Sequence, residues 1–155
     1  MMLTIRLFAQ SQNPNEYVNK FVTVPAISVY TVPDSSIFTN KHLRKNTPFL
    51  LMFFSPDCDH CHKQTKELLA YKKELKGIQI LLLSVAPYQE IKHFYDEFGL
   101  SDMPNLKVGQ DINFKLGATY KVNTYPSIFV YDQKATLAKA FIGNKAVQAI
   151  LDALQ

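Results

Sequence analysis

Two continuous apolar runs dominate the hydropathy pattern of the chain. PFLLMFFS, residues 48–55, and IQILLLSVA, residues 78–86, are each about as long as a single strand. Apolar runs of this length without polar alternation are typical of strands that are buried on both faces, as in a parallel sheet covered by helices. We therefore expect these two segments to lie at the centre of a sheet.

Helical spacing of apolar residues follows each of these runs. Residues 62–77 predict a helix that ends at Gly77, with one apolar face made of Leu68, Leu69, Tyr71 and Leu75. Pro87 can open the next helix and Gly99 can close it, with a face made of Ile91, Phe94, Tyr95 and Phe98. A short helix is expected within residues 111–122, and a last one over residues 144–155.

The remaining segments predict strands and connections. PSIFVYD and TLAKAFIG, residues 126–132 and 136–143, are separated by QKA and predict an antiparallel hairpin. Residues 101–111 predict a connecting loop. Residues 21–32 are rich in β-branched side chains, but Pro25 limits them to an edge strand or an irregular extended segment. PDSS then predicts a turn, with Ser35 or Ser36 as the cap of a short helix through Leu43.

Strands that alternate with helices and end in a hairpin predict an α/β fold with a mixed central sheet. The length fits one domain, which we assign to residues 21–155. Residues 1–20 are predicted to be a leader, because LFAQ followed by the polar SQNPNE resembles the end of a bacterial export signal. A short first strand or a frayed terminus explains the same residues equally well.

Composition narrows the function classes. Hydrophobic residues make up 47% and charged residues 19% of the chain, which is ordinary for a globular protein. The net charge of +4 comes from 17 basic and 13 acidic residues. Because the basic residues are scattered among other types, we expect no nucleic-acid partner. No segment is apolar for long enough to predict a membrane span.

Both cysteines lie in FFSPDCDHCHKQT, residues 53–65, where the first buried strand ends and its helix begins. A thiolate at a helix N-terminus faces unpaired N–H groups and the positive end of the helix dipole. We therefore expect the pKa of Cys58 to lie below the ordinary value of about 8.5. The two-residue spacer lets Cys61 close a disulfide with Cys58 after Cys58 has attacked a substrate. A protonated His60 would stabilise the Cys58 thiolate, whereas Asp59 would oppose this.

Other uses of the cysteines fit less well. A zinc site needs further ligands, but CDHCH offers at most three and His42 and His93 are isolated, so no metal is predicted. A structural disulfide across two residues would constrain the unfolded chain little. C-x-x-C between a buried strand and a helix favours redox chemistry, with the Cys58–Cys61 disulfide as the only cofactor.

A second motif, YKVNTYPSIFVYD at residues 120–132, places Tyr125-Pro126 before a predicted strand. From spacing alone, a trans proline at the start of an edge strand is favoured. With this motif and FFSPDCDHCHK, the chain resembles the thioredoxin-like superfamily over about residues 32–155. It resembles most the exported thiol–disulfide oxidoreductases of the TlpA/ResA type, in a form common among Bacteroidetes. The resemblance implies a thioredoxin-like fold, a cis Pro126 beside the cysteines, and substrate contacts at Tyr125 and Pro126.

The sequence departs from these relatives where they keep a carboxylate near the cysteines. Thioredoxins have a buried Asp where this chain has Met52, and ResA-type proteins have a Glu where it has Gln64. Glu67, one helical turn further on, is expected at the surface. The usual proton acceptors for Cys61 are therefore absent, and the direction of electron flow stays open.

The predicted function is a thiol–disulfide oxidoreductase that acts as a monomer on protein thiols and disulfides and is served by an upstream redox protein. The resemblance implies a periplasmic or other extracytoplasmic location, with the cytoplasm as the alternative. Two other functions stay open: a non-enzymatic thioredoxin-like module that binds a metal or a protein, and a thiol peroxidase.

Overall fold

A computed structural model describes residues 20–155, so nearly all of the predicted leader lies outside the described residues. In this part of the chain one mixed sheet has the strand order β2-β1-β5-β4-β3-β6-β7. Strands β3, β4 and β5 run parallel to one another, and the remaining neighbours pair antiparallel. The strands are β1 Ser28–Val32, β2 Ile37–Thr39, β3 Phe49–Phe53, β4 Gln79–Ser84, β5 Leu106–Gln110, β6 Ser127–Tyr131 and β7 Leu137–Ile142.

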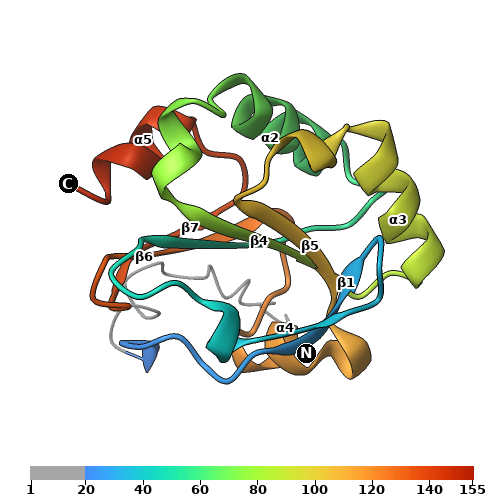
Figure 1. Cartoon of the computed structure of the whole chain (residues 1–155), viewed down its shortest axis with the longest axis horizontal. Coiled ribbons are helices and arrows are strands. Elements are labelled where there is room, and N and C mark those ends of the chain that lie inside the picture. Colours follow the sequence, from blue (N-terminus) through green and yellow to red (C-terminus); the bar gives the residue numbers. More distant parts are fainter. Residues whose placement is uncertain (1–19) are drawn as a thin grey trace, which may run out of the picture.

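Helices cover both faces of this sheet (Figure 1). Helices α2, α3 and α5 lie on one side of it, and α4 lies on the other. The α-helices are α2 Asp59–Ala70, α3 Tyr88–Glu97, α4 Lys115–Thr119 and α5 Val147–Asp152, and the short 3-10 helices are η1 Asn40–His42, η2 Glu74–Gly77, η3 Leu100–Asp102 and η4 Ile112–Phe114. Within residues 20–155, none of the helices has the length and apolar character needed to cross a membrane.

The central strand β3 explains why the first apolar run has no polar alternation. Leu50 and Met52 belong to the core under α2, α3 and α5, whereas Leu51 and Phe53 belong to the core on the α4 side. Every residue of β3 is buried. The prediction of an α/β fold with a mixed sheet, two buried parallel strands and a terminal hairpin is thus confirmed.

The loop predicted over residues 101–111 is wrong, because β5 lies within it. Leu106 and Val108 are buried, and Lys107 between them is exposed. Gly109 sits so close to Val29 and Leu83 that an added Cβ would lie 3.1–3.2 Å from their side chains. The β5 segment, LKVGQ, contains a glycine and only two apolar residues, so its own strand propensity is low. Pairing with β1 on one side and with β4 on the other therefore determines its structure.

The first predicted elements also need correction. Of the two alternatives for residues 21–32, the irregular segment holds around Pro25, because residues 24–27 form neither strand nor helix. Strand β1 follows this segment and is not at the edge, since it pairs with both β2 and β5. Neither Ser35 nor Ser36 caps a helix: Ser35 has a φ of 56°, and Ser36 Oγ lies 2.7 Å from Thr31 Oγ1 across the β1–β2 hairpin. The chain then forms β2, and Thr39 caps the short η1 instead.

Candidate active site

Helix α2 begins at the first cysteine. Cys58 has extended backbone angles, and its Sγ accepts a hydrogen bond from the N–H of Cys61 at 3.3 Å, so the sulfur itself caps the helix. The Sγ atoms of Cys58 and Cys61 lie 2.8 Å apart. This geometry places an N–H donor and the second sulfur against the atom that would carry negative charge in a Cys58 thiolate.

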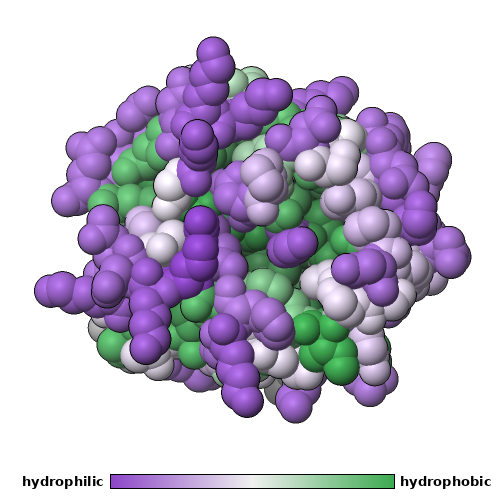
Figure 2. All heavy atoms as spheres, in the orientation of Figure 1, coloured by the Kyte–Doolittle hydropathy of each residue, from purple (hydrophilic) through white to green (hydrophobic). Residues whose placement is uncertain are grey.

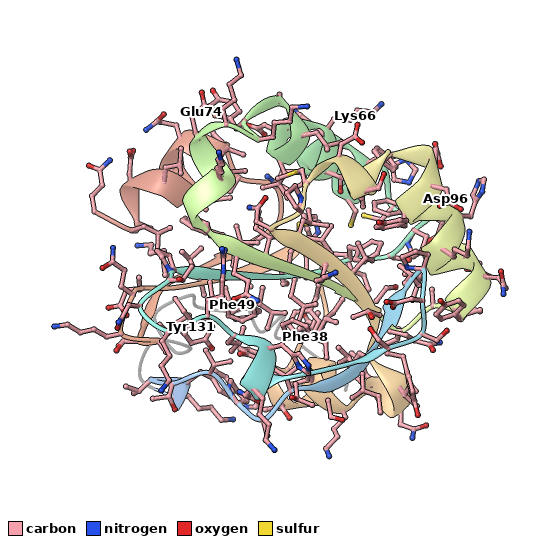
Figure 3. All side chains as sticks on the ribbon, in the orientation of Figure 1. Phe38, Phe49, Lys66, Glu74, Asp96 and Tyr131 are labelled. Carbon is pink, nitrogen blue, oxygen red and sulfur yellow. The ribbon has the colours of Figure 1, made fainter. Side chains whose placement is uncertain are left out.

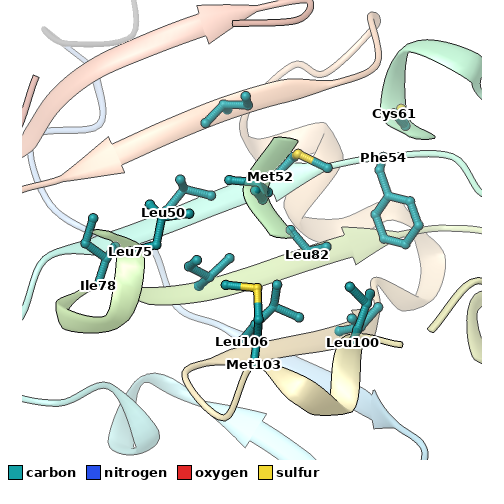
Figure 4. Close-up of a cluster of buried hydrophobic side chains, with 14 of the residues drawn as sticks. Leu50, Met52, Phe54, Cys61, Leu75, Ile78, Leu82, Leu100, Met103 and Leu106 are labelled. Carbon is teal, nitrogen blue, oxygen red and sulfur yellow. The ribbon is translucent and has the colours of Figure 1, made fainter. Parts of the chain in front are cut away.

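The two cysteines differ in exposure. Cys58 is half-buried, whereas Cys61 is 0% exposed. Figure 4 shows Cys61 at the start of its helix, next to the apolar cluster that holds Phe54 and Met52. Burial is the largest cause that raises the pKa of Cys61, followed by its hydrogen bond to Cys58. Cys58 is therefore the more accessible of the two cysteines, and the thiol of Cys61 is buried.

The Tyr125-Pro126 motif lies against the cysteine pair. The peptide bond between these two residues is cis. The thiol of Cys58 donates a long hydrogen bond, 3.8 Å, to the carbonyl oxygen of Tyr125. Tyr125 is half-buried, and burial raises the pKa of its phenol, with smaller contributions from the charges of Asp111 and Cys61.

His60 faces the segment after β7. The amide Nδ2 of Asn144 donates to the backbone carbonyl of His60 at 2.6 Å, so Oδ1 is turned toward the ring and lies 2.9 Å from Nδ1. Because Oδ1 can only accept, the proton of the imidazole is assigned to Nδ1. Asp59 is exposed in the first turn of α2, where a carboxylate interacts favourably with the helix dipole.

His62 lies on another side of α2. Its Nε2 is hydrogen-bonded to the carbonyl oxygen of Pro56, and its ring contacts Phe94 in α3 and Phe98 directly after α3. This histidine therefore joins α2 to α3 and to the loop before Cys58.

Two side chains on α2 hold the start of α5. The buried amide of Gln64 is hydrogen-bonded to both backbone groups of Lys145. Glu67 accepts a hydrogen bond from the N–H of Val147 at 3.0 Å. The expectation that Glu67 lies at the surface is wrong, because this half-buried carboxylate satisfies an N–H in the first turn of α5.

Asp111 is a buried acidic residue that sequence reasoning missed. It is 2% exposed and follows β5 directly. Its two carboxylate oxygens accept hydrogen bonds from the N–H groups of Leu116 and Gly117 at the start of α4. An Asp at the start of the helix expected within residues 111–122 is a recognised cap signal that could have identified it.

Metal-binding side chains do not gather at this site. Within residues 20–155, no three His, Cys, Asp or Glu side chains are placed to hold one ion. What the site offers is two thiols of unequal exposure beside an extended backbone segment, an arrangement suited to thiol–disulfide exchange.

A mixed sheet, a helix that begins at C-x-x-C and a facing cis-proline define a protein of the thioredoxin-fold class. The chain belongs to the family of the thioredoxin-like domain, whose model matches residues 39–155. No curated protein matches the chain at the level of sequence.

Solved structures share the fold at low identity. A secreted disulfide oxidoreductase of Mycobacterium tuberculosis, described as homologous to DsbE of E. coli, is 18% identical with a TM-score of 0.69, over 83% of this chain and 96% of that one. StoA of Bacillus subtilis is 14% identical with a TM-score of 0.65, over 85% and 98%. The exposed lipoprotein thioredoxin Etrx1 of Streptococcus pneumoniae is 24% identical with a TM-score of 0.65, over 84% and 100%.

Proposed function

We propose that the protein is a thiol–disulfide oxidoreductase that exchanges disulfides with cysteines of other proteins. The observation that carries the proposal is the pairing of an accessible Cys58 sulfur with a buried Cys61 sulfur 2.8 Å away, at the start of a helix. No cofactor besides the Cys58–Cys61 disulfide is required.

In the reducing direction, the Cys58 thiolate attacks one sulfur of a substrate disulfide. The substrate S–S bond breaks, a mixed disulfide with Cys58 forms, and the first substrate cysteine leaves as a thiolate that takes up a proton. Cys61 then gives up its proton and attacks the Cys58 sulfur, which releases the second substrate cysteine. The substrate has gained two electrons and two protons, and the protein holds the Cys58–Cys61 disulfide. Oxidation of a substrate is the reverse.

Tyr125 and Pro126 would bind the substrate backbone. Among the described residues, none accepts a hydrogen bond from the N–H of Tyr125, the residue whose carbonyl oxygen lies 3.8 Å from Cys58 Sγ. An extended substrate segment can offer the missing acceptor as it places its sulfur at Cys58. His60 and Asp59, exposed next to Cys58, would adjust the balance between thiol and disulfide.

The location and partners follow from the same chemistry. An extracytoplasmic compartment is supported by the export-like start of the chain and by relatives described as secreted or surface-exposed. There the protein would act as a monomer, and an upstream redox protein would restore Cys58 and Cys61 after each turnover.

The test is to trap the mixed disulfide. Cys61→Ser should accumulate substrate proteins linked through Cys58, visible as bands on non-reducing gels that reductant removes. Cys58→Ser is the matched control and should trap none. The wild-type pair should also equilibrate with glutathione buffers. Absence of trapped proteins together with no exchange would contradict the proposal, and stoichiometric metal in the reduced protein would favour the binding module instead.

A further inference from the structure

We propose that the protein has a second binding site, for a small organic anion with at least two negative charges, at the end of the sheet opposite the cysteines. Cys58 follows the carboxyl end of β3. The second site is a pocket lined by Gln79 at the amino end of β4 and by Asn105 and Lys107 at the amino end of β5. Because β3, β4 and β5 are parallel, the two sites lie at opposite ends of these strands.

The pocket has a volume of about 570 Å³ and a cationic lining. Arg44, Lys76 and Lys107 contribute three positive charges from three separate segments of the chain. No Asp or Glu is among its lining residues, and within residues 20–155 none of these three cations takes part in an ion pair. Small-molecule sites have volumes of roughly 300–1,000 Å³, so a drug-sized anion fits.

Two side-chain amides fix the backbone that carries these charges. Gln79 donates to the carbonyl of His42 at 2.9 Å and accepts from the N–H of Arg44 at 2.8 Å. Asn105 donates to the carbonyls of Leu75 and Ile78, which flank Lys76 in η2. The backbone beside Arg44 and Lys76 is therefore held in place, which reduces the conformational entropy that the protein loses when an anion binds.

His42 adds an uncharged donor. Its Nδ1 accepts a hydrogen bond from the N–H of Thr39 at 3.0 Å, so the ring carries its proton on Nε2. The ring also stacks on Phe38, with 5.4 Å between the ring centroids. The position and tautomer of His42 are thus both defined by the short η1 turn.

The lining of the pocket also includes apolar side chains. Ile37 is 54% exposed there, next to Phe38, and Figure 2 shows apolar surface bordered by hydrophilic side chains near the centre of this view. The nearby carboxylate of Asp34 is already bonded to the hydroxyls of Thr31 and Ser36 and to the N–H of Ser36. A lining that combines cations with apolar side chains favours a phosphate or carboxylate group attached to a hydrophobic body.

Phenyl phosphate is a suitable probe, with inorganic phosphate and phenol as its two halves. Titration followed by amide chemical shifts and by calorimetry should show one saturable site, with shifts at residues 37–44 and 104–107. Phenyl phosphate should bind at least tenfold more tightly than either half, and more weakly as salt is added.

Charge variants locate the site. Lys76→Gln with Lys107→Gln should weaken binding at least tenfold. The matched control is Lys66→Gln with Lys139→Gln, which removes the same charge from exposed positions on α2 and on the edge strand β7. Figure 3 shows Lys66 far from Phe38. The control should bind within twofold of the wild type.

Three results would overturn the proposal: no saturable binding, equal losses in the two double variants, or binding of an acidic peptide but not of phenyl phosphate. Because the cysteines are untouched in all variants, thiol–disulfide exchange can be measured in parallel and judged separately.

Discussion

The buried amide of Gln64 makes both of its hydrogen bonds to the backbone of one residue, Lys145. Nε2 donates to the Lys145 carbonyl at 2.9 Å, and Oε1 accepts from the Lys145 N–H at 2.7 Å. Gln64 is 0% exposed and lies three residues after Cys61. In this protein the position where ResA-type relatives carry a Glu therefore fastens α2 to the segment before α5.

Gln64→Glu should destabilise the protein at neutral pH. A carboxylate cannot donate to the Lys145 carbonyl and would be a buried charge, at a cost of roughly 1–3 kcal/mol. Burial raises the pKa of such a carboxyl group, and its protonated form can donate as the amide does. Stability relative to wild type should thus recover at low pH and be lost as the pH rises through the raised pKa. Urea unfolding across pH 4–8 measures this.

Gln89→Glu at an exposed position on α3 adds the same single negative charge and is the control. It should lie within about 0.5 kcal/mol of wild type at neutral pH. A Gln64→Glu protein as stable as this control at every pH would show that the two bonds to Lys145 contribute nothing.

Cys61 should make the reduced protein less stable in alkaline solution. Burial raises the pKa of this thiol above the ordinary cysteine value of about 8.5, so the unfolded chain loses the proton at a lower pH than the folded protein does. The contribution of Cys61 to the free energy of unfolding is complete below that ordinary value. It is lost as the pH rises, and the free energy of unfolding then falls by at most about 1.4 kcal/mol per pH unit.

Chemical unfolding of the reduced protein between pH 7 and pH 10 tests this, with Cys61→Ser as the comparison. Cys58 is present in both proteins, so the difference between their slopes reports Cys61. Parallel pH dependences would rule out a raised pKa at this thiol.

The sequence reveals strongly patterned elements better than elements that depend on pairing. The apolar runs of β3 and β4 and the cysteines between β3 and α2 follow from local pattern, because strands covered on both faces must be apolar throughout. Strand β5 depends on neighbours distant in sequence. The partners of Gln64 and Asn144 could not be predicted either, since they join α2 to a segment about 80 residues away, and no pattern within α2 encodes that contact.

A buried pair of tyrosines should stabilise the α4 side of the core. The hydroxyls of Tyr120 and Tyr131 lie 2.7 Å apart, and both residues are 0% exposed. Burial raises the pKa of Tyr131 to about 12 and that of Tyr120 further. Tyr131→Phe leaves the Tyr120 hydroxyl without its partner and should cost roughly 1–3 kcal/mol of unfolding free energy.

The double variant Tyr120→Phe with Tyr131→Phe should lose less than the sum of the two single losses, because no orphaned hydroxyl remains. Thermal or urea unfolding of the four proteins completes the cycle. Additive losses would mean that the two hydroxyls do not act as a pair.

Asn144 should determine the tautomer of His60. With its Nδ2 bonded to the His60 carbonyl, Asn144 presents Oδ1 to the ring and favours the proton on Nδ1. Nitrogen-15 spectra of neutral His60 should therefore show a protonated Nδ1 and a bare Nε2 in the wild type. In Asn144→Ala the Nδ1–H preference should disappear. In Asn144→Asp it should remain, because a carboxylate still accepts from Nδ1–H.

The same variants separate positioning of His60 from a merely structural contact. If His60 adjusts the cysteine pair, Asn144→Ala should shift the glutathione equilibrium of Cys58 and Cys61 in the same direction as His60→Ala. The double variant should then show the same equilibrium as His60→Ala alone. Asn144→Asp, which keeps the tautomer but adds a negative charge, should destabilise the reduced thiolate and favour the disulfide. An unchanged equilibrium in Asn144→Ala, despite a changed tautomer, would limit Asn144 to holding α2 against the segment after β7.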